Sequence, residues 1–404
     1  MRKHRRTVAL VVLAASLFAA PASAGQRART GSLAAKTVAL LAAVVDIEAG
    51  RRTTPLIGEP HADGSATVTF LARRGGGPVP RIISDVTGWG ERPDDTFDFK
   101  SGTMSRVGRT DWYWLETTVA ARARIEYLVA HGLRDYRGDP YNPRRTAIRG
   151  TSPASEFVMP GYVPPEEFED APVTPAGRVT PAAVDSPTLG EERRAIVYTP
   201  PDYRDDGEYA LAVFHGGTNV ADSGVGPRVL DWLIARHAIE PTVAVFVDSW
   251  PRVNDEEELA RLRAFLAGEL LEWVGSRYAV SARANRRAIL GISFGARDAL
   301  DAAVRSDAFG LVGLLIPGRR MTPADIRALA GEPRHRVRLT ILGGLYDAPN
   351  LSTARMARKA FAHAGHRVDY IEVPEGHNQG TWRNHLRDVL VSLFGTNQGP
   401  EHRR

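Results

Sequence analysis

The segment Arg287–Asp298, RAILGISFGARD, holds a serine between two glycines in the pattern Gly291-x-Ser293-x-Gly295. The apolar residues before it are typical of a short buried strand, and the residues after it are typical of a helix. A serine on such a strand-to-helix turn projects above the strand end and can act as a nucleophile, and the cramped turn needs small neighbours. The pattern also arises by chance, so the role of Ser293 depends on partners elsewhere.

A serine hydroxyl is a weak nucleophile until a base removes its proton. His377 lies in the loop after the last predicted strand, and Asp347 lies in the loop after the strand that precedes it. The chain order Ser293, Asp347, His377 is one of the known orders of a catalytic triad. We therefore predict that Ser293 is the nucleophile, His377 the base and Asp347 the acid that orients the imidazole. The alternatives are a turn serine, a surface histidine and an aspartate that caps the next helix.

An ester or amide substrate would also need donors for the negative oxygen that forms during attack. The N–H of Phe294 lies at the start of the predicted helix, where the helix dipole favours negative charge. A second donor is expected after the predicted strand at residues 209–214, in a loop that begins His215-Gly-Gly. We predict the N–H of Gly217 as that donor, with Gly216 as the next candidate.

The composition excludes several other chemistries. The 404 residues include no cysteine, which rules out thiol catalysis, cysteine-ligated zinc and iron–sulfur clusters. The histidines near the end of the predicted helix at 352–364 do not suggest a metal site, so we expect neither a metal nor an organic cofactor. The first 24 residues hold four basic and no acidic side chains, so their removal lowers the formal net charge from +5 to +1. The basic pI therefore does not indicate a nucleic-acid partner.

Residues 1–24 are typical of a secretory signal peptide, with a basic start, an apolar stretch at 8–20 and a small-x-small sequence before Gly25. We predict export to the periplasm or the extracellular space, with no stable membrane span after cleavage. The alternative is an uncleaved anchor. The apolar stretch is too short to span a bilayer comfortably.

The remaining chain divides into two predicted domains. Residues 25–165 begin with a short amphipathic helix at 32–45 and continue with alternating apolar and polar residues at 66–71, 112–119 and 124–129, which is typical of a small β-sandwich. Eight prolines fall between 153 and 187, and we predict a proline-rich linker and the start of the catalytic domain at 166–188.

Residues 189–398 alternate strand and helix patterns, which predicts an α/β domain with a mostly parallel sheet and helices on both faces. Together with the triad order, this fold class is that of an α/β-hydrolase domain preceded by a small β-sandwich domain.

Several segments resemble the "putative esterase" family of α/β-hydrolases, and within it the enterochelin (ferric enterobactin) esterases. The resemblance covers most of the chain after the signal segment. The resembling segments are Tyr198–Tyr203, Val243–Ser249 followed by Arg252, Phe265–Leu271 and Gly376-His377 with Trp382 in the catalytic half, and Val86–Trp89, Arg124–Tyr127, Asp139–Pro143 and Met159–Tyr162 in the N-terminal half.

The resemblance implies hydrolysis of an ester such as the backbone of a triscatecholate siderophore. The chain departs from the family pattern in three loops. These are Ala296-Arg297 after the serine, Pro317–Met321 after the next strand, and Glu375–Asn378 around the histidine. These departures leave the predicted triad intact, but they indicate that the substrate can differ from that of the family.

Three residues are candidates for substrate binding. Arg252 matches a family position, Arg297 lies one helical turn beyond Ser293, and Trp382 lies near His377. The arginines would favour a small anionic or catecholate ester. The alternatives are that Arg297 pairs with an aspartate on its own helix and that Trp382 packs the wall of the site.

The sequence therefore predicts an exported serine esterase acting on a small-molecule ester, with siderophore esters as candidates. The sequence also leaves two alternatives. The first is a carbohydrate or hydroxycinnamoyl esterase, or an acyltransferase, with the same triad. The second is an inactive hydrolase that serves as an extracytoplasmic binding protein.

Overall fold

The computed structural model describes residues 24–90, 96–132, 135–149, 152–249, 255–318, 320–331, 335–348 and 350–396. Apart from Ala24, the predicted signal segment lies outside these residues. Within them, no helix combines the length and the apolar character that a membrane crossing requires.

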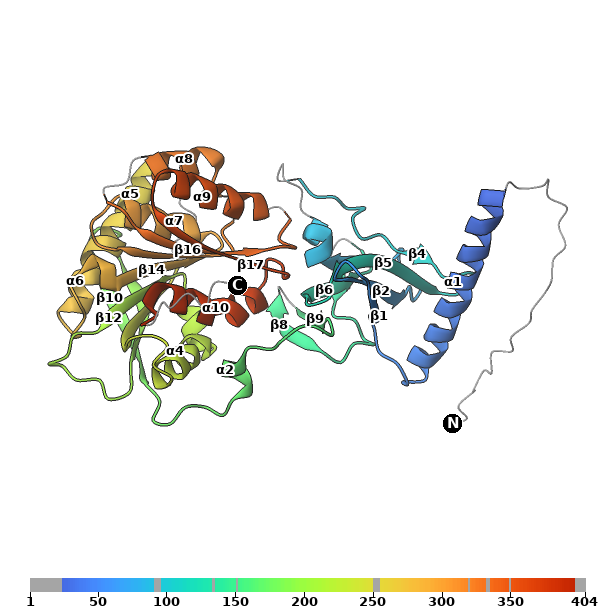
Figure 1. Ribbon diagram of the computed structural model, residues 1–404, viewed down its shortest axis with the longest axis horizontal. Helices are drawn as coiled ribbons and strands as arrows, with labels where there is room; N and C mark the ends of the chain where they lie inside the picture. The colour runs from blue at the N-terminus through green and yellow to red at the C-terminus, as the bar shows by residue number, and fades with distance from the viewer. Residues whose placement is uncertain are drawn as a thin grey trace.

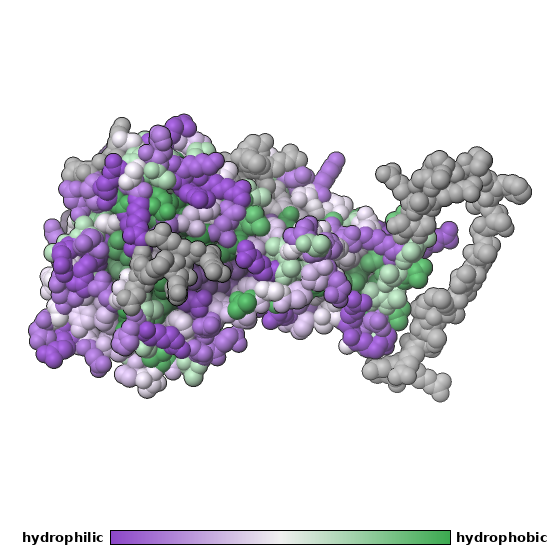
Figure 2. Space-filling view, in the orientation of Figure 1, coloured by the Kyte–Doolittle hydropathy of each residue, from purple (hydrophilic) through white to green (hydrophobic). Residues whose placement is uncertain are grey.

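The described chain begins with the helix α1 (Ala24–Glu48), which is longer than the predicted helix at 32–45. One side of α1 packs on the sheet that follows, through a cluster that includes Leu40, Val44 and Trp112. The other side exposes apolar side chains, visible as a green patch along the helix in Figure 2, which includes Leu33, Val38 and Val45.

The first domain is a sandwich of two antiparallel sheets (Figure 1). The rings of Phe70, Tyr127 and Phe157, which come from both sheets, meet edge to face with centroids 5.0 to 6.1 Å apart. The predicted sandwich is confirmed. One sheet contains β1 (Leu56–Pro60), β2 (Ser65–Arg73), β5 (Trp112–Ala120) and β4 (Ser105–Arg106), and the other contains β3 (Arg81–Ser84), β6 (Arg124–Ala130), β7 (Tyr136–Arg137), β8 (Arg145–Arg149) and β9 (Ser152–Val158).

The second domain is built on an eight-stranded sheet in the order β10-β11-β13-β12-β14-β15-β16-β17. The pairs β10–β11 and β11–β13 are antiparallel, and every later pair in this order is parallel. The predicted mostly parallel sheet is therefore confirmed. The strands are β10 (Arg178–Ser186), β11 (Glu191–Thr199), β12 (Ala210–His215), β13 (Thr242–Val247), β14 (Arg287–Ile292), β15 (Leu311–Leu315), β16 (Arg338–Gly344) and β17 (Arg367–Val373). Strand β10 lies within the segment expected to hold the linker and the start of this domain.

Helices cover both faces of this sheet (Figure 1). One face packs against α3 (Thr218–Asp222), α4 (Val225–Ala235) and α10 (Gln379–Phe394). The other packs against α5 (Glu256–Ala264), α6 (Leu270–Gly275), α7 (Gly295–Val304), α8 (Pro323–Gly331) and α9 (Leu351–His363). A π-helical segment, η2 (Phe265–Glu269), joins α5 to α6.

The short elements that remain are α2 (Glu166–Glu169), η1 (Asp85–Gly90) and η3 (Ala284–Arg286). The strands β12, β14, β16 and β17 all run parallel, so their carboxyl ends meet at one edge of the sheet. In open α/β sheets this edge is where ligands bind. The β-sandwich contacts the same edge, because the N–H of Ala120 donates to the hydroxyl of Tyr346 after β16, at 2.7 Å.

Candidate active site

Ser293 lies on a strained turn between β14 and α7. Its φ is +53°, in the left-handed region that a serine rarely adopts. The turn is tied to the next strand, because the N–H of Ser293 donates to the carbonyl of Leu315 at 3.0 Å and its carbonyl accepts from Gly318 at 3.1 Å. A side chain at Gly291 would clash with the turn, since a Cβ there would lie 2.1 Å from the carbonyl oxygen of Gly295.

Substitution of Gly291 by alanine is expected to destabilise the fold by about 3 kcal/mol or more, because the added methyl overlaps backbone that cannot move without opening the turn. Urea unfolding followed by circular dichroism measures this change. The matched control is Gly268→Ala, in the helical segment η2, where an added Cβ meets no atom within 4 Å. The control is expected to change the free energy of unfolding by less than about 1 kcal/mol. Equal stabilities for the two variants would contradict the steric account of the turn.

The three residues predicted as a triad lie together at the carboxyl edge of the sheet. The Oγ of Ser293 is 2.7 Å from Nε2 of His377. Nδ1 of His377 is 2.7 Å from Oδ2 of Asp347, whose side chain is only 2% exposed. Asp347 does not act as the side-chain cap of the next helix, because the residue at the start of α9 is Asn350. The serine, the imidazole and the carboxylate therefore form one chain of hydrogen bonds.

Asn350 is a member of this site that the sequence did not indicate. Its Nδ2 donates to Oδ1 of Asp347 at 2.6 Å and lies 3.2 Å from Nδ1 of His377. Both carboxylate oxygens of Asp347 are thus engaged, one by the imidazole and one by the amide, and this fixes the plane of the carboxylate. The only sequence signal was an amide three residues after the acid, at the start of a helix.

The three backbone N–H groups predicted as oxyanion donors differ in whether they already have a hydrogen-bond acceptor. Phe294 lies directly before α7 and next to the nucleophile, as expected. Gly217 is wrong as a donor, because its N–H donates to the carbonyl of Val247 at 3.0 Å. Within the described part of the chain, the N–H of Gly216 has no protein acceptor. Gly216 also has a φ of +71°, which accounts for glycine at this position.

His215 holds the loop of Gly216 next to the serine turn. The imidazole is buried, and its Nε2 lies 3.2 Å from Oδ2 of Asp298 in the first turn of α7. The backbone carbonyl of His215 lies 3.2 Å from where a Cβ of Gly295 would stand. The second glycine of the serine motif therefore allows the close approach of the strand that carries the predicted donors.

The predicted substrate-binding residues are less well placed. Trp382 is wrong as a substrate contact, because its side chain is buried in the core between α10 and the sheet. Arg297 pairs with Asp325 of α8 at 3.3 Å, rather than with an aspartate on its own helix. The carboxylate of Asp325 therefore offsets the positive charge of Arg297 that was expected to attract an anionic substrate. Arg252 lies outside the described residues.

Two other side chains flank the nucleophile. Phe294 is 45% exposed, and the guanidinium of Arg320 lies 5.1 Å from the centroid of its ring. The loop that carries Arg320 is close to the serine, because a Cβ at Gly318 would stand 3.5 Å from Oγ of Ser293. The surroundings of the serine therefore include an aromatic face and a positive charge.

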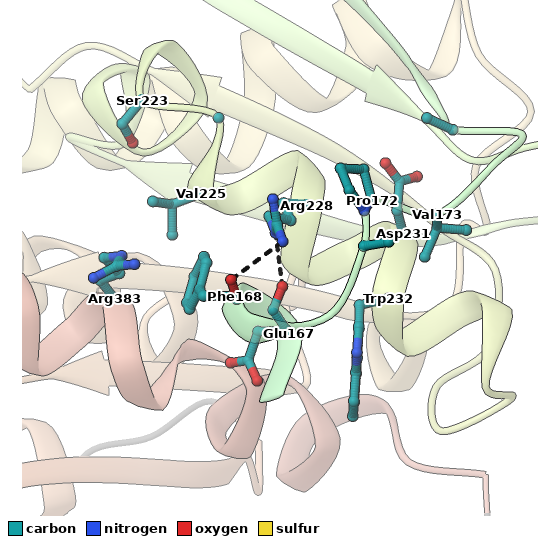
Figure 3. A pocket seen from close by; sticks show the side chains of 13 residues that line it. Glu167, Phe168, Pro172, Val173, Ser223, Val225, Arg228, Asp231, Trp232 and Arg383 are labelled. Carbon is teal, nitrogen blue, oxygen red and sulfur yellow. Dashed lines mark hydrogen bonds between the residues drawn. The ribbon is translucent and has the colours of Figure 1, made fainter. Parts of the chain in front are cut away.

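A cavity of about 430 Å³ elsewhere in the second domain does not belong to this site (Figure 3). It lies between α2 with the segment that follows it, the region of α4, and Arg383 near the start of α10, and its wall includes Phe168 and Trp232. Arg228 extends along the cavity and donates to the carbonyl of Glu167 at 2.7 Å. No triad residue lines the cavity. Among the described residues, no three His, Asp or Glu side chains are grouped so that they could hold a metal ion.

The family to which the chain belongs follows from a comparison with family models. Residues 186–393 match the family described as "Putative esterase", which covers just over half of the chain. The chain belongs to this family. As a member of the esterase family it is a carboxylic ester hydrolase, and the matched residues include the serine turn, the acid loop and the histidine loop. A comparison with curated proteins finds no match.

Solved structures of other esterases are similar to this chain, and two of them match it across both domains. The ferric enterobactin esterase of Salmonella typhimurium matches with a TM-score of 0.68 at 22% identity, over 85% of this chain and 96% of that one. The enterobactin esterase of Shigella flexneri, solved in the presence of enterobactin, matches with a TM-score of 0.64 at 21% identity over the same shares. A ferulic acid esterase of Anaeromyces mucronatus matches with a TM-score of 0.50 at 15% identity, over 58% of this chain and 96% of that one.

Proposed function

We propose that this esterase works through a serine acyl-enzyme in which Ser293 is the nucleophile, His377 the general base and acid, and Asp347 the residue that orients the imidazole. The observation that carries the proposal is the chain of two hydrogen bonds, each 2.7 Å long, that joins the three side chains. Both bonds lie within the range that proton transfer between a nucleophile and its base requires.

In the first half of the reaction, Oγ of Ser293 attacks the carbonyl carbon of the ester and its proton passes to Nε2 of His377. The carbonyl π electrons move to the oxygen, and the N–H groups of Phe294 and Gly216 donate to that oxyanion. When the oxyanion collapses, the bond from carbon to the alcohol oxygen breaks. His377 gives its proton to the leaving alcohol, and the acyl group remains on Ser293.

In the second half, His377 removes a proton from water while the water oxygen attacks the acyl carbon. The bond to Oγ then breaks, the serine recovers its proton from His377, and the carboxylic acid leaves. Asp347 accepts a hydrogen bond from Nδ1 throughout, so Nε2 is always the nitrogen that faces the serine.

We further propose a catecholate ester, of the kind found in trilactone siderophores, as the substrate. Two enterobactin esterases match 85% of this chain, which includes both domains. The ferulic acid esterase matches 58% of the chain, a length close to that of the hydrolase domain alone. The exposed ring of Phe294 and the guanidinium of Arg320 beside it support an aromatic substrate with negative charge.

A substrate panel tests the proposal. We expect kcat/KM for a catecholate trilactone, with or without iron, to exceed the values for phenyl acetate, methyl ferulate and acetylated sugars by about tenfold or more, because only the trilactone presents both aromatic and anionic groups. Release of acid is measured by titration and by chromatography of the products. Faster hydrolysis of methyl ferulate or of an acetylated sugar would replace the siderophore assignment, and a folded protein that hydrolyses none of them would contradict the esterase mechanism itself.

A further inference from the structure

The β-sandwich packs directly on the backbone of the loop that carries His377. Two glycines lie close to the histidine, at positions 376 and 380. A Cβ at Gly376 would stand 2.0 Å from Oδ1 of Asp85, and a Cβ at Gly380 would stand 2.0 Å from Nη1 of Arg124. Asp85 begins η1 and Arg124 begins β6, so both belong to the first domain. These two side chains occupy the space that any larger residue at either glycine would need.

The same two side chains hydrogen-bond to Asn378, the residue after the histidine. Nη1 of Arg124 donates to Oδ1 of Asn378 at 3.1 Å, and Nδ2 of Asn378 donates to Oδ2 of Asp85 at 2.9 Å. The Oδ1 atom also accepts from the N–H of Thr381 at 3.0 Å, which caps α10. One amide thus joins the first domain, the histidine loop and the start of the last helix.

Arg124 carries a permanent charge in this interface. Its side chain is 5% exposed and faces Glu126, Glu156 and Glu375, with nitrogen–oxygen distances of 2.8, 2.6 and 3.5 Å. Burial opposes the charge, but these carboxylates outweigh it and raise the pKa of the guanidinium. Glu375 belongs to the histidine loop and also contacts Nε2 of His385 at 2.8 Å. The guanidinium of Arg124 therefore has carboxylate partners in its own domain, Glu126 and Glu156, and one in the catalytic domain, Glu375.

Asp85 is equally enclosed, with 1% of its surface exposed. Its Oδ2 accepts from the N–H of Glu126 at 2.8 Å, and its Oδ1 accepts from Nε1 of Trp89 at 2.9 Å. Burial, together with the nearby Glu126 carboxylate, raises the pKa of Asp85 to about 6. A buried ionic network of this kind adds little to stability compared with apolar packing, but its directional bonds fix one arrangement of the groups.

We propose that Asp85 and Arg124 are positioning residues for ester hydrolysis, which set the backbone of the histidine loop so that His377 meets Ser293. Neither residue touches a triad side chain, so they act through Asn378 and through the two glycines. The ring of His377 is restrained by Asp347 and Asn350 from within the catalytic domain, and its backbone is restrained by the first domain. This inference rests on the proposed role of His377 as the general base.

The test compares Asp85→Ala and Asp85→Asn with the unmodified full chain. A catalytic group displaced by about 1 Å loses about a hundredfold in rate, so we expect Asp85→Ala to lower kcat by about 10²-fold with KM changed less than about twofold. Asp85→Asn keeps one acceptor oxygen and is expected to recover part of that loss. Aryl acetate hydrolysis gives both constants, and circular dichroism with thermal unfolding checks the fold.

Arg124→Lys is the second variant. It tests the positioning role of this interface even if the Asp85 variants do not fold. A lysine keeps the charge, but its single nitrogen cannot take the places of both Nη1, which donates to Asn378, and Nη2, which donates to Glu126, so kcat is again expected to fall with KM nearly unchanged. The matched control is Tyr162→Phe, which removes a bond across the same interface, from Nδ2 of Asn384 to the hydroxyl at 2.8 Å, and leaves the two bonds to Asn378 in place. Its kcat is expected to stay within about twofold of the original.

Two results would overturn the proposal. The first is a wild-type kcat in folded Asp85→Ala or Arg124→Lys protein. The second is an equal loss of kcat in Tyr162→Phe, which would mean that domain docking in general, rather than this contact, supports activity. Failure of the triad itself is recognised separately, because Ser293→Ala would then retain activity.

Discussion

Ser293→Ala protein is expected to hydrolyse esters about 10⁶-fold more slowly than the unmodified chain in kcat, with an unchanged fold. The reason is that the alanine leaves no oxygen for acyl transfer, while His377, Asp347 and the backbone donors remain in place. The residual rate would come from substrate binding and from the N–H donors alone. Hydrolysis of an aryl acetate under single-turnover conditions measures the loss.

A fluorophosphonate probe gives an independent reading of the same residue. It should label the unmodified chain at Ser293, as located by peptide mass mapping, and it should not label the alanine variant. The matched control is Ser306→Ala, just beyond α7, where the hydroxyl donates to the carbonyl of Ala302 and accepts from the N–H of Ala308, and the expected change in kcat is less than about twofold. Persistent hydrolysis by Ser293→Ala would refute the acyl-enzyme mechanism.

Asp347→Asn is expected to lower kcat by about 10⁴-fold. The carboxylate accepts from His377 with one oxygen and from Asn350 with the other, at 2.7 and 2.6 Å. An asparagine has only one acceptor, and Asn350 donates to the position that the oxygen would then take. The NH₂ group therefore faces Nδ1 of His377, which favours the tautomer whose proton lies on Nε2. That nitrogen can no longer accept the proton of Ser293.

The control for this substitution is Asp369→Asn on β17. Asp369 is a partly exposed carboxylate that pairs with Arg338 at 3.2 Å and accepts from Ser392. It lies one strand away from the acid loop, and its loss is expected to leave kcat within about twofold. If Asp347→Asn kept more than a tenth of the original kcat in a folded protein, the orientation of His377 would have to depend on other groups.

The members of the triad could be predicted because each has a local signature. Ser293, Asp347 and His377 each follow an apolar strand of a parallel sheet, and the carboxyl ends of such strands meet at one edge whatever the connecting helices contain. The mostly parallel sheet and the leading sandwich followed from the same periodic patterns. The structure brings the three residues to that edge as expected.

What could not be predicted depends on contacts that leave no local pattern. Arg124 and Asp85 are separated from their partner Asn378 by 254 and 293 residues, and in a single sequence a buried arginine on a strand looks like a solvated one. A glycine pair does not reveal which N–H donates to the carbonyl of Val247, so the sequence could not distinguish Gly216 from Gly217 as the oxyanion donor. The pairing of Arg297 with Asp325 depends on where α8 packs, and the order of elements does not determine that.

The long span between Asp85 and Asn378 also has a consequence for the synthesis of the chain. The 293 residues that follow Asp85, up to and including Asn378, take roughly 15 to 60 s to translate at ordinary rates, so the first domain emerges well before the histidine loop exists. During that interval the guanidinium of Arg124 and the carboxylate of Asp85 lack their partners across the domain boundary. The closing of this interface must therefore be one of the last events of maturation, and esterase activity should appear only when the final helix has docked.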